Sequence, residues 1–249
     1  MTTREALRAR VRALVAAEPP SQDVDTLGTV GWLDRLCRAA VRALSATGAG
    51  VSVMTADGVR GVAAASDPAC AALEEIQFTL GEGPSVEAFS LRRPVLEPDL
   101  DAASTGRWPG YRVAAQQAGV RAAFAFPLQV GAARLGVLGL HRRSTGALSP
   151  GAVMQGLTFA EIVVDTLLDG QEHALAGTAP TRLDRTLDRA LDSQFTVYQA
   201  QGAAMIDLGV SLADAMARLQ AHAYANDRTL QDVARDVLAG RLRLEPDRL

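Results

Sequence analysis

Apolar residues recur every three or four positions along five stretches of the chain, and this spacing predicts amphipathic helices. The first stretch ends before Pro19, because proline disfavours helical backbone in the residue that precedes it. The last begins at Ser149 and Pro150, a good helix cap followed by a residue that suits the first helical position. The predicted helices lie at residues 3–17, 32–44, 67–76, 108–117 and 150–171.

Four shorter stretches have the pattern of β-strands. Residues 51–55 alternate in polarity, a tight turn at 56–58 follows, and residues 59–64 return as the second strand of a hairpin. Residues 122–128 place their aromatic side chains on one side, and 135–140 are almost continuously apolar, as expected of a central strand. We therefore predict an α+β fold, most simply a single antiparallel sheet with helices packed on one side.

Three short amphipathic helices are predicted at the C-terminal end. The first covers residues 195–206, and the next two begin at Ser211 and Thr229, each with an aspartate three residues later as in a capping box. Their apolar positions are few and small, so the core is small and such a domain is marginal by itself. Periodicity alone favours a helical dimerisation module.

A linker and an apolar seam separate these two parts. Residues 170–180 mix Gly, Ala and Pro, which is typical of a hinge. Beyond them apolar residues recur every four positions on one helix face. They are Leu183, Leu187, Leu191 and Phe195. We expect this seam to pair with a second copy of the chain; the alternative is that it packs back on the sheet domain.

The charge balance excludes nucleic-acid binding by bulk positive charge. The 249 residues include 25 basic residues, all of them Arg, and the formal net charge is −3. From Thr181 onward nine Arg face ten Asp and Glu, which gives a net charge of −1. RNA binding by this part of the chain would therefore have to use a local arginine face and shape.

Cysteine and histidine usage predicts no disulfide framework, no metal and no cofactor. Cys37 and Cys70 are the two cysteines, and the three histidines are scattered at 141, 173 and 222. The N-terminal residues have no apolar segment of the signal-peptide kind. No run approaches the roughly 18 apolar residues of a membrane span. These observations lead us to expect a cytoplasmic protein.

Catalytic chemistry finds little support in the sequence. The nucleophile candidates Ser85 and Cys70 have no histidine nearby in sequence. The middle of the chain is rich in carboxylates but has no His or Lys among them to form an acid–base pair. These carboxylates are Glu74, Glu75, Glu82, Glu87, Glu97, Asp99 and Asp101. We predict that the protein is not an enzyme.

The C-terminal residues carry a family resemblance. The chain reads Gln-Ala-Gln-Gly at 199–202, Gly-Val-Ser at 209–211 and Arg-Thr-Leu at 228–230. With Ala215, Leu219, Ala223 and 233–234, this spacing resembles the ANTAR domain, a three-helix RNA-binding module of bacterial transcription antiterminators. Gln201 stands where the motif commonly has lysine, which removes a phosphate contact.

The larger part resembles a second family. The sequences Gly-Val-Ser-Val at 50–53, Phe-Thr-Leu-Gly-Glu-Gly-Pro at 78–84 and Phe-Ala-Phe-Pro-Leu at 124–128 are similar to GAF domains, small-molecule sensors. They resemble the actinobacterial branch, which is often fused to ANTAR. Ser85 stands where that branch usually has cysteine after the Gly-Pro pair.

The two resemblances imply two sites. RNA contacts are expected from polar and aromatic side chains beside the apolar stripe of the C-terminal helices. They are Gln201, Arg218, His222, Tyr224, Arg228 and Arg235, with Arg241 as a further exposed candidate. The alternative is that the arginines pair with Asp214, Asp232 or Asp236 on a solvated surface.

A sensor ligand is expected in an apolar cavity near the 81–84 bend. Its predicted lining is Phe78, Gly81, Glu82, Gly83, Trp108, Phe124 and Phe126.

The resemblance implies a four-part chain: a helical arm (1–24), a GAF sensor (25–172), a linker and connector helix (173–194) and an ANTAR domain (195–249). It implies a homodimeric regulator whose ANTAR domain binds tandem RNA stem-loops to promote antitermination. A signal at the GAF domain, from a ligand that the sequence does not identify, would control it. The alternative function is a dimerisation or protein-interaction module that has lost RNA binding.

Overall fold

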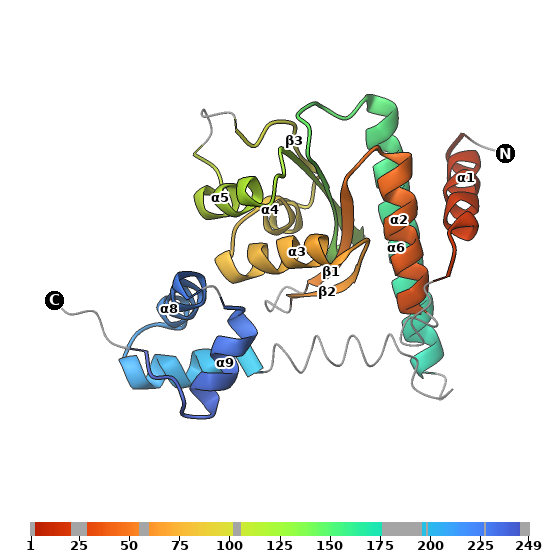
Figure 1. The fold of residues 1–249 in the computed structure, drawn as a ribbon. Helices are drawn as coiled ribbons and strands as arrows, with labels where there is room; N and C mark the ends of the chain where they lie inside the picture. Colours follow the sequence, from red (N-terminus) through yellow and green to blue (C-terminus); the bar gives the residue numbers. More distant parts are fainter. Residues whose placement is uncertain are drawn as a thin grey trace.

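The computed structural model describes residues 3–20, 29–54, 60–101, 106–175, 196–197, 199–226 and 228–244, and Figure 1 shows its two parts. We call residues 3–175 the sheet domain and residues 196–244 the helical domain. The elements of the sheet domain, in order, are α1 (Thr3–Ala17), α2 (Thr29–Ala43), β1 (Gly48–Met54), β2 (Arg60–Ala65), α3 (Pro68–Leu80), α4 (Pro84–Leu91), β3 (Val95–Glu97), α5 (Pro109–Gln117), β4 (Ala122–Val130), β5 (Ala133–Arg142) and α6 (Pro150–Leu175). The helical domain has a helix at 199–208, then α8 (Leu212–Ala225) and α9 (Leu230–Leu238).

The predicted single antiparallel sheet is confirmed. Its five strands lie in the order β2-β1-β5-β4-β3, and every neighbouring pair is antiparallel. The central strand β5 pairs with both β1 and β4, which explains its almost continuous apolar sequence. The turn expected at 56–58 lies outside the described residues.

Helices cover both faces of the sheet, so the expectation of helices on one side only is wrong. α2 and α6 pack on one face, whereas α3, α4 and α5 pack on the other (Figure 1). The physical reason is visible on β4, where successive side chains alternate between the two faces. Phe124 and Phe126 point toward α2 and α6, while Ala123 and Ala125 belong to the core under α3, α4 and α5.

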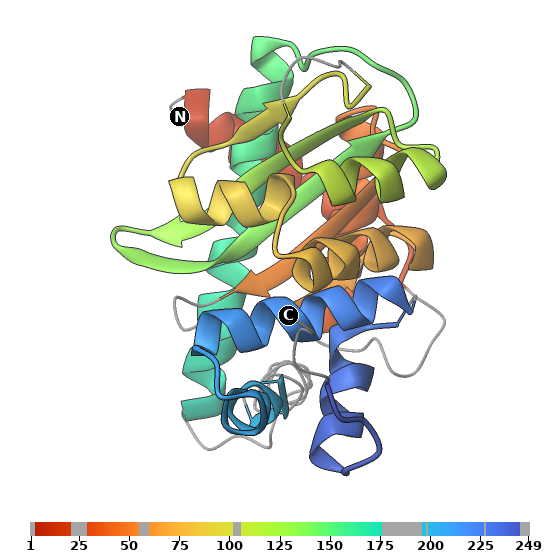
Figure 2. The ribbon, with the colours of Figure 1, turned by 90° about the vertical axis from the view of Figure 1, so that its left-hand side faces the viewer.

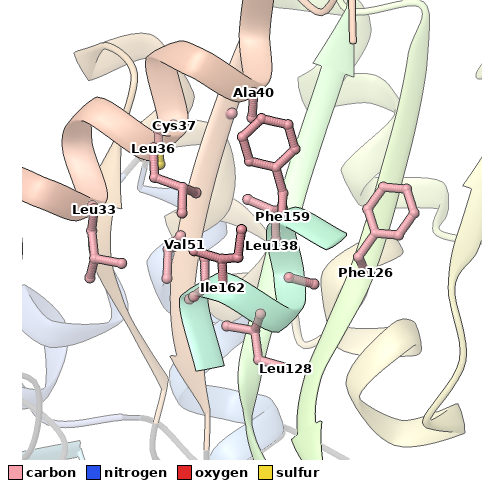
Figure 3. Close-up of a cluster of buried hydrophobic side chains, with 14 of the residues drawn as sticks. Leu33, Leu36, Cys37, Ala40, Val51, Phe126, Leu128, Leu138, Phe159 and Ile162 are labelled. Carbon is pink, nitrogen blue, oxygen red and sulfur yellow. The ribbon is translucent and has the colours of Figure 1, made fainter. Parts of the chain in front are cut away.

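The core between the sheet and α2 and α6 contains most of the largest fully buried side chains among the described residues. Figure 3 shows Phe126, Phe159 and Ile162 gathered with leucines of α2 and the strands. Gly156 of α6 allows this approach, because a Cβ there would lie 2.5 Å from the Phe126 ring. α6 therefore packs closely on β4, and a larger residue at 156 would force the two elements apart.

α6 is the one described helix that is long and apolar enough, over Pro150–Asp169, to cross a membrane. Gln155, Glu161 and Asp165 interrupt this stretch, so it is not the continuous run of about 18 apolar residues that the sequence was expected to lack. Phe159, Ile162 and Val163 of this helix are buried in the sheet-domain core, which accounts for its apolar composition. Its polar side binds α1 through ion pairs. They join Arg4 to Glu161 (2.6 Å), Arg8 to Glu161 (3.1 Å) and Asp165, and Arg12 to Asp165 (3.2 Å).

The three helices predicted for the C-terminal end are present within the described residues. Ser211 and Thr229 cap α8 and α9 as expected, each accepting the backbone N–H of the aspartate three residues on, at 3.1 Å. A small core holds them together, formed by Val197, Ala200, Leu219, Ala223, Val233 and Ala234. The predicted seam, Leu183, Leu187, Leu191 and Phe195, lies outside the described residues.

α8 of the helical domain packs against α3 of the sheet domain. Figures 1 and 2, which view the molecule from directions 90° apart, both show these helices side by side. At the contact, Gln220 approaches the left-handed Gly81 that ends α3, within 3.0 Å of where a Cβ would lie.

Candidate sensor and RNA-binding sites

The bend at residues 81–84 ends one helix and begins the next. Gly81 is the left-handed cap of α3, with φ +69°, and Gly83 precedes α4 with φ +131°. Both values lie where glycine is favoured. At Gly83 a Cβ would also lie 2.5 Å from the Gln77 amide oxygen. The two predicted ligand glycines therefore have structural roles in the helix termini.

Glu82, between them, caps a third helix. Its Oε1 accepts the backbone N–H groups of Gly110 (2.7 Å) and Tyr111 (3.0 Å) at the start of α5. These are N–H groups that a helix N-terminus leaves without an internal partner, and the helix dipole favours a carboxylate there. Glu82 thus fixes α5 to the bend, and this occupies the carboxylate that was predicted to face a ligand.

The four predicted aromatic residues do not share a cavity. Phe78 and Trp108 belong to the core under α3, α4 and α5, but Phe124 and Phe126 lie on the opposite face of the sheet. The prediction of a cavity lined by all four is wrong, because alternation along β4 directs Phe124 and Phe126 away. Trp108 is held by its own contacts: its Nε1 donates to Glu87 (3.0 Å), and the Arg107 guanidinium lies 4.2 Å from its ring centre.

A buried polar cluster lies between the sheet and the helices α3 and α4. Glu74 Oε2 accepts hydrogen bonds from the hydroxyls of Ser85 (2.9 Å) and Ser52 (3.2 Å). Gln77 donates to the Ser85 hydroxyl (3.2 Å) and accepts the Ser85 backbone N–H (2.8 Å). Ser85, at the position where the branch resembled in sequence usually has cysteine, therefore supplies a hydroxyl donor to a buried carboxylate.

Glycines on the sheet make room for this carboxylate. A Cβ at Gly139 would lie 2.3 Å from Glu74 Oε1, and one at Gly50 would lie 3.2 Å from its Cγ. Gly50 and Gly139 are paired across β1 and β5. Sequence reasoning grouped Glu74 with the other carboxylates of this region. The sequence alone does not single out Glu74, because only the tertiary structure shows that this residue of α3 faces the paired glycines of the sheet.

Burial raises the pKa of Glu74 to about 7, although the hydrogen bonds from Ser85, Ser52 and Gln77 act in the opposite direction. The cluster therefore holds a carboxyl group whose protonation changes near neutral pH. Among its neighbours, desolvation raises the pKa of the Tyr111 hydroxyl and of the Cys70 thiol, with the nearby Glu74 charge adding to both shifts. These two groups remain neutral.

Two pockets lie elsewhere on the chain. One of about 570 Å³ lies between α1, β4 and α6, with Leu7, Met154 and Leu157 among its lining residues. The other, of about 500 Å³, lies where α3 and α5 meet α8 and the start of α9. Neither is lined by any of the seven residues predicted for the sensor site.

In the helical domain Gln201 is buried, with 9% of its surface exposed. Its amide donates to the backbone carbonyl of Leu212 (2.7 Å), which ties the first helix to the start of α8. The prediction that this side chain contacts RNA is therefore wrong for the arrangement seen here, because its polar group is already used inside the domain.

Most of the predicted arginines form ion pairs, as the alternative interpretation held. Arg228 and Arg241 both bind Asp236, at 2.6 and 2.7 Å, and Arg235 binds Asp232 at 2.8 Å. The paired arginines hold the pKa of Asp236 below its ordinary value. Arg218 and His222 lie one turn apart on α8, partly exposed, and Tyr224 is 51% exposed. These three side chains are part of the accessible polar and aromatic surface of α8, together with Asp214 and Gln220.

Comparison with protein-family models matches residues 31–167 to the GAF domain and residues 185–238 to the ANTAR domain. The first match covers more than half of the chain. The chain belongs to the GAF family. It carries a C-terminal ANTAR domain, so the two resemblances noted in the sequence are confirmed at the level of the domains.

One solved structure supports the GAF fold, and a second is similar to part of the chain. The GAF domain of an Acinetobacter phosphoenolpyruvate-protein phosphotransferase has 11% identity and a TM-score of 0.50, covering 72% of this chain and 99% of that one. A GAF domain region of a putative membrane protein from Geobacter sulfurreducens has 18% identity and a TM-score of 0.49, covering 58% and 96%. A comparison with curated proteins finds no match. The likeness to the Acinetobacter domain establishes the fold alone.

Two of the predicted RNA-binding residues lie at the junction of the domains. Tyr224 and Arg228 of the ANTAR domain line the 500 Å³ pocket together with residues of α3 and α5 of the GAF domain. The surface expected to meet RNA is therefore in part directed toward the GAF domain.

The nucleophile and base candidates of the GAF domain are all buried. Burial lowers the pKa of His141 to about 4, so it is neutral at ordinary pH. Its ring packs on Gly48, where a Cβ would lie 2.4 Å away. Desolvation raises the pKa of the thiols of Cys37 and Cys70, which disfavours the reactive thiolate. Within the described residues, no group of three or more His, Cys, Asp or Glu side chains could hold a metal.

Proposed function

We propose that this protein is a cytoplasmic bacterial regulator, without enzymatic activity, whose ANTAR domain binds tandem RNA stem-loops and promotes transcription antitermination. The observation that carries the proposal is the match of residues 185–238 to the ANTAR domain. Its three helices enclose their own small core, with Arg218, His222 and Tyr224 beside it and partly or largely exposed. Arginine contacts phosphates and stacks on unpaired bases, and tyrosine offers a stacking face to a loop nucleotide.

The GAF domain is the controlling element in this proposal. The chain acts as a homodimer through the seam at residues 183–195, and a signal at the GAF domain changes the geometry of the paired ANTAR domains. The packing of α8 on α3 supports such control, because a change in α3 reaches the ANTAR domain by direct contact. The Glu74 cluster lies on the inner side of the same helix.

The alternative function is a dimerisation or protein-interaction module that has lost RNA binding. Two observations favour it. Gln201, in place of the usual lysine, is turned inward. Residues 196–244 also contain five Arg and five Asp, and three of the arginines form ion pairs. The two functions differ in one measurable property, which is the affinity for hairpin RNA.

The deciding experiment compares a tandem stem-loop RNA with duplex and single-stranded controls of equal length, by fluorescence anisotropy at several salt concentrations. We expect preference for the stem-loops and a shallow salt dependence, corresponding to roughly two to four phosphate contacts per domain. Tyr224→Ala should lose about 1–3 kcal/mol of binding free energy if the ring stacks on a base. Arg218→Ala should reduce the salt slope.

Gln201→Ala is the matched control inside the same domain. Loss of its internal hydrogen bond should lower the stability of the ANTAR domain by about 0.5–1.5 kcal/mol. The RNA affinity of the folded protein should not change, because the side chain is buried. Equal binding of stem-loop and duplex RNA at low salt would overturn the antiterminator proposal in favour of the interaction module.

A further inference from the structure

The pocket of about 500 Å³ at the domain junction has the size of a small-molecule site. Its walls come from α3 and α5 of the GAF domain and from α8 and the start of α9 of the ANTAR domain. Its lining residues place it between α3 and α8, the two helices that lie side by side in Figures 1 and 2. A molecule bound there would touch both domains at once.

Most of this pocket is apolar. Ile76 and Leu80 project from α3, one turn apart, and Ala114 and Ala223 line it from α5 and α8. Contact with such walls removes an organic molecule's apolar surface from water, which favours binding. The walls alone would accept any compact hydrocarbon group, so selectivity has to come from the polar groups.

Glu75 supplies the distinguishing charge. Its carboxylate lines the pocket, is only partly exposed, and forms no hydrogen bond or ion pair with any described residue. Desolvation raises the pKa of Glu75, and within the described part of the chain no cation measurably counters this shift. A partly desolvated carboxylate without a partner is unfavourable, and a positively charged ligand group would relieve this cost.

Two further side chains of the lining, Tyr224 and Arg228, bear on the ligand charge, beside the neutral Thr79, Gln117 and Thr229. Tyr224 is among the lining residues, and the faces of aromatic rings attract organic cations. Arg228 lies at the same pocket, but its guanidinium is bound to Asp236 at 2.6 Å. A carboxylate, an aromatic ring and apolar walls together form the environment that suits an organic ammonium ion.

We propose that the junction pocket binds a small organic ammonium ion with an apolar body, and that the bound cation holds the ANTAR domain against the GAF domain. The ammonium group pairs with Glu75 and faces the Tyr224 ring, while the body lies against Ile76, Leu80 and Ala223. Because both domains contribute walls, the ligand binds the docked arrangement better than the separated one and shifts the equilibrium toward docking.

The first test is calorimetric titration of the full chain with 2-phenylethylamine and with its neutral counterpart 2-phenylethanol. The amine should bind at least about tenfold more tightly than the alcohol, a difference of roughly 1.4 kcal/mol. Glu75→Gln keeps the shape of the side chain and removes its charge, so it should remove this preference. Glu5→Gln, on α1 at the far side of the sheet, is the matched control and should bind like the unmodified protein.

The second test follows backbone hydrogen exchange in α3 and α8, with and without the amine. Bound amine should slow exchange along the faces of these helices that meet, and Glu75→Gln should abolish the effect. Amine binding no tighter than alcohol binding, or an amine affinity unchanged by Glu75→Gln, overturns the site. Binding that leaves α3 and α8 unprotected overturns the coupling. Neither readout contains RNA, so a negative result here is distinct from a failure of RNA binding.

Discussion

Glu74 places a carboxyl group of pKa about 7 between the sheet and α3, against an ordinary value of 4.5. The folded chain therefore holds this proton more tightly than the unfolded chain does. Between those two pH values the unfolded state has lost the proton and the folded state has kept it, so stability falls as pH rises. The difference between the two pKa values corresponds to a loss of roughly 3 kcal/mol in the free energy of unfolding. This loss is complete once the pH exceeds about 7.

Glu74→Gln should remove this fall, because an amide does not titrate. Urea unfolding of both proteins, at pH values below and above 7, measures it as a change in the free energy of unfolding. Ser85→Ala is the companion variant. It removes the hydroxyl that stabilises the ionised form, so the midpoint of the fall should move to higher pH. Parallel pH profiles for Glu74→Gln and the unmodified chain would contradict the assignment.

At the scale of elements, the capping of α5 by Glu82 makes a local prediction. Glu82→Ala leaves the N–H groups of Gly110 and Tyr111 without their acceptor, and should lower stability by about 1–2 kcal/mol. Glu82→Gln keeps an oxygen acceptor and should lose less. Thermal unfolding measures both, and the neighbouring Glu87→Gln, which keeps α5 capped, serves for comparison. Equal stability of Glu82→Ala and the unmodified chain would show that water replaces the cap.

The sequence predicted the positions of helices and strands better than it predicted how they pack against each other. Periodicity and caps correctly located α1, α5, α6, α8 and α9, because those signals are local. The eight-residue α4 was missed, since the glycines and proline before it indicated a bend and its apolar residues have no clear helical period. Phe124 and Phe126 were assigned to one side of a strand correctly, but which helices cover that side depends on the whole sheet.

The same limit applies to the sites. Gln201 and Glu82 were identified as notable residues, yet their polar groups are used in internal hydrogen bonds that join segments distant in sequence. Glu74 and Glu75 are adjacent, but one faces the sheet and the other lines the junction pocket. The sequence alone does not distinguish the environments of these two glutamates, because those environments depend on how α3 packs between the sheet and the ANTAR domain.

At the scale of the whole molecule, dimerisation through the apolar seam stays a prediction. Leu187→Asp with Leu191→Asp places two charges on that helix face, so light scattering should show a weaker dimer than the unmodified chain forms. Thr186→Asp with Arg189→Asp, off the seam, is the matched control and should leave the dimer intact. A monomer at micromolar concentration for the unmodified chain would remove the coupling proposed between paired ANTAR domains.

The contact of α8 with the end of α3 gives a second prediction at this scale. Gln220 lies beside Gly81, where α3 presents the partial negative charge of its C-terminus. Gln220→Glu should weaken docking of the ANTAR domain by about 0.3–1 kcal/mol, whereas Gln220→Arg should preserve or strengthen it. Neither substitution touches the buried residues of α8, so both domains should keep their stability. Small-angle scattering should then show a more extended molecule for Gln220→Glu alone. Since Tyr224 and Arg228 lie at this junction, Gln220→Glu should also bind stem-loop RNA more tightly than the unmodified chain does. Identical scattering from Gln220→Glu and Gln220→Arg would show that the contact of Gln220 with the end of α3 does not control docking of the ANTAR domain.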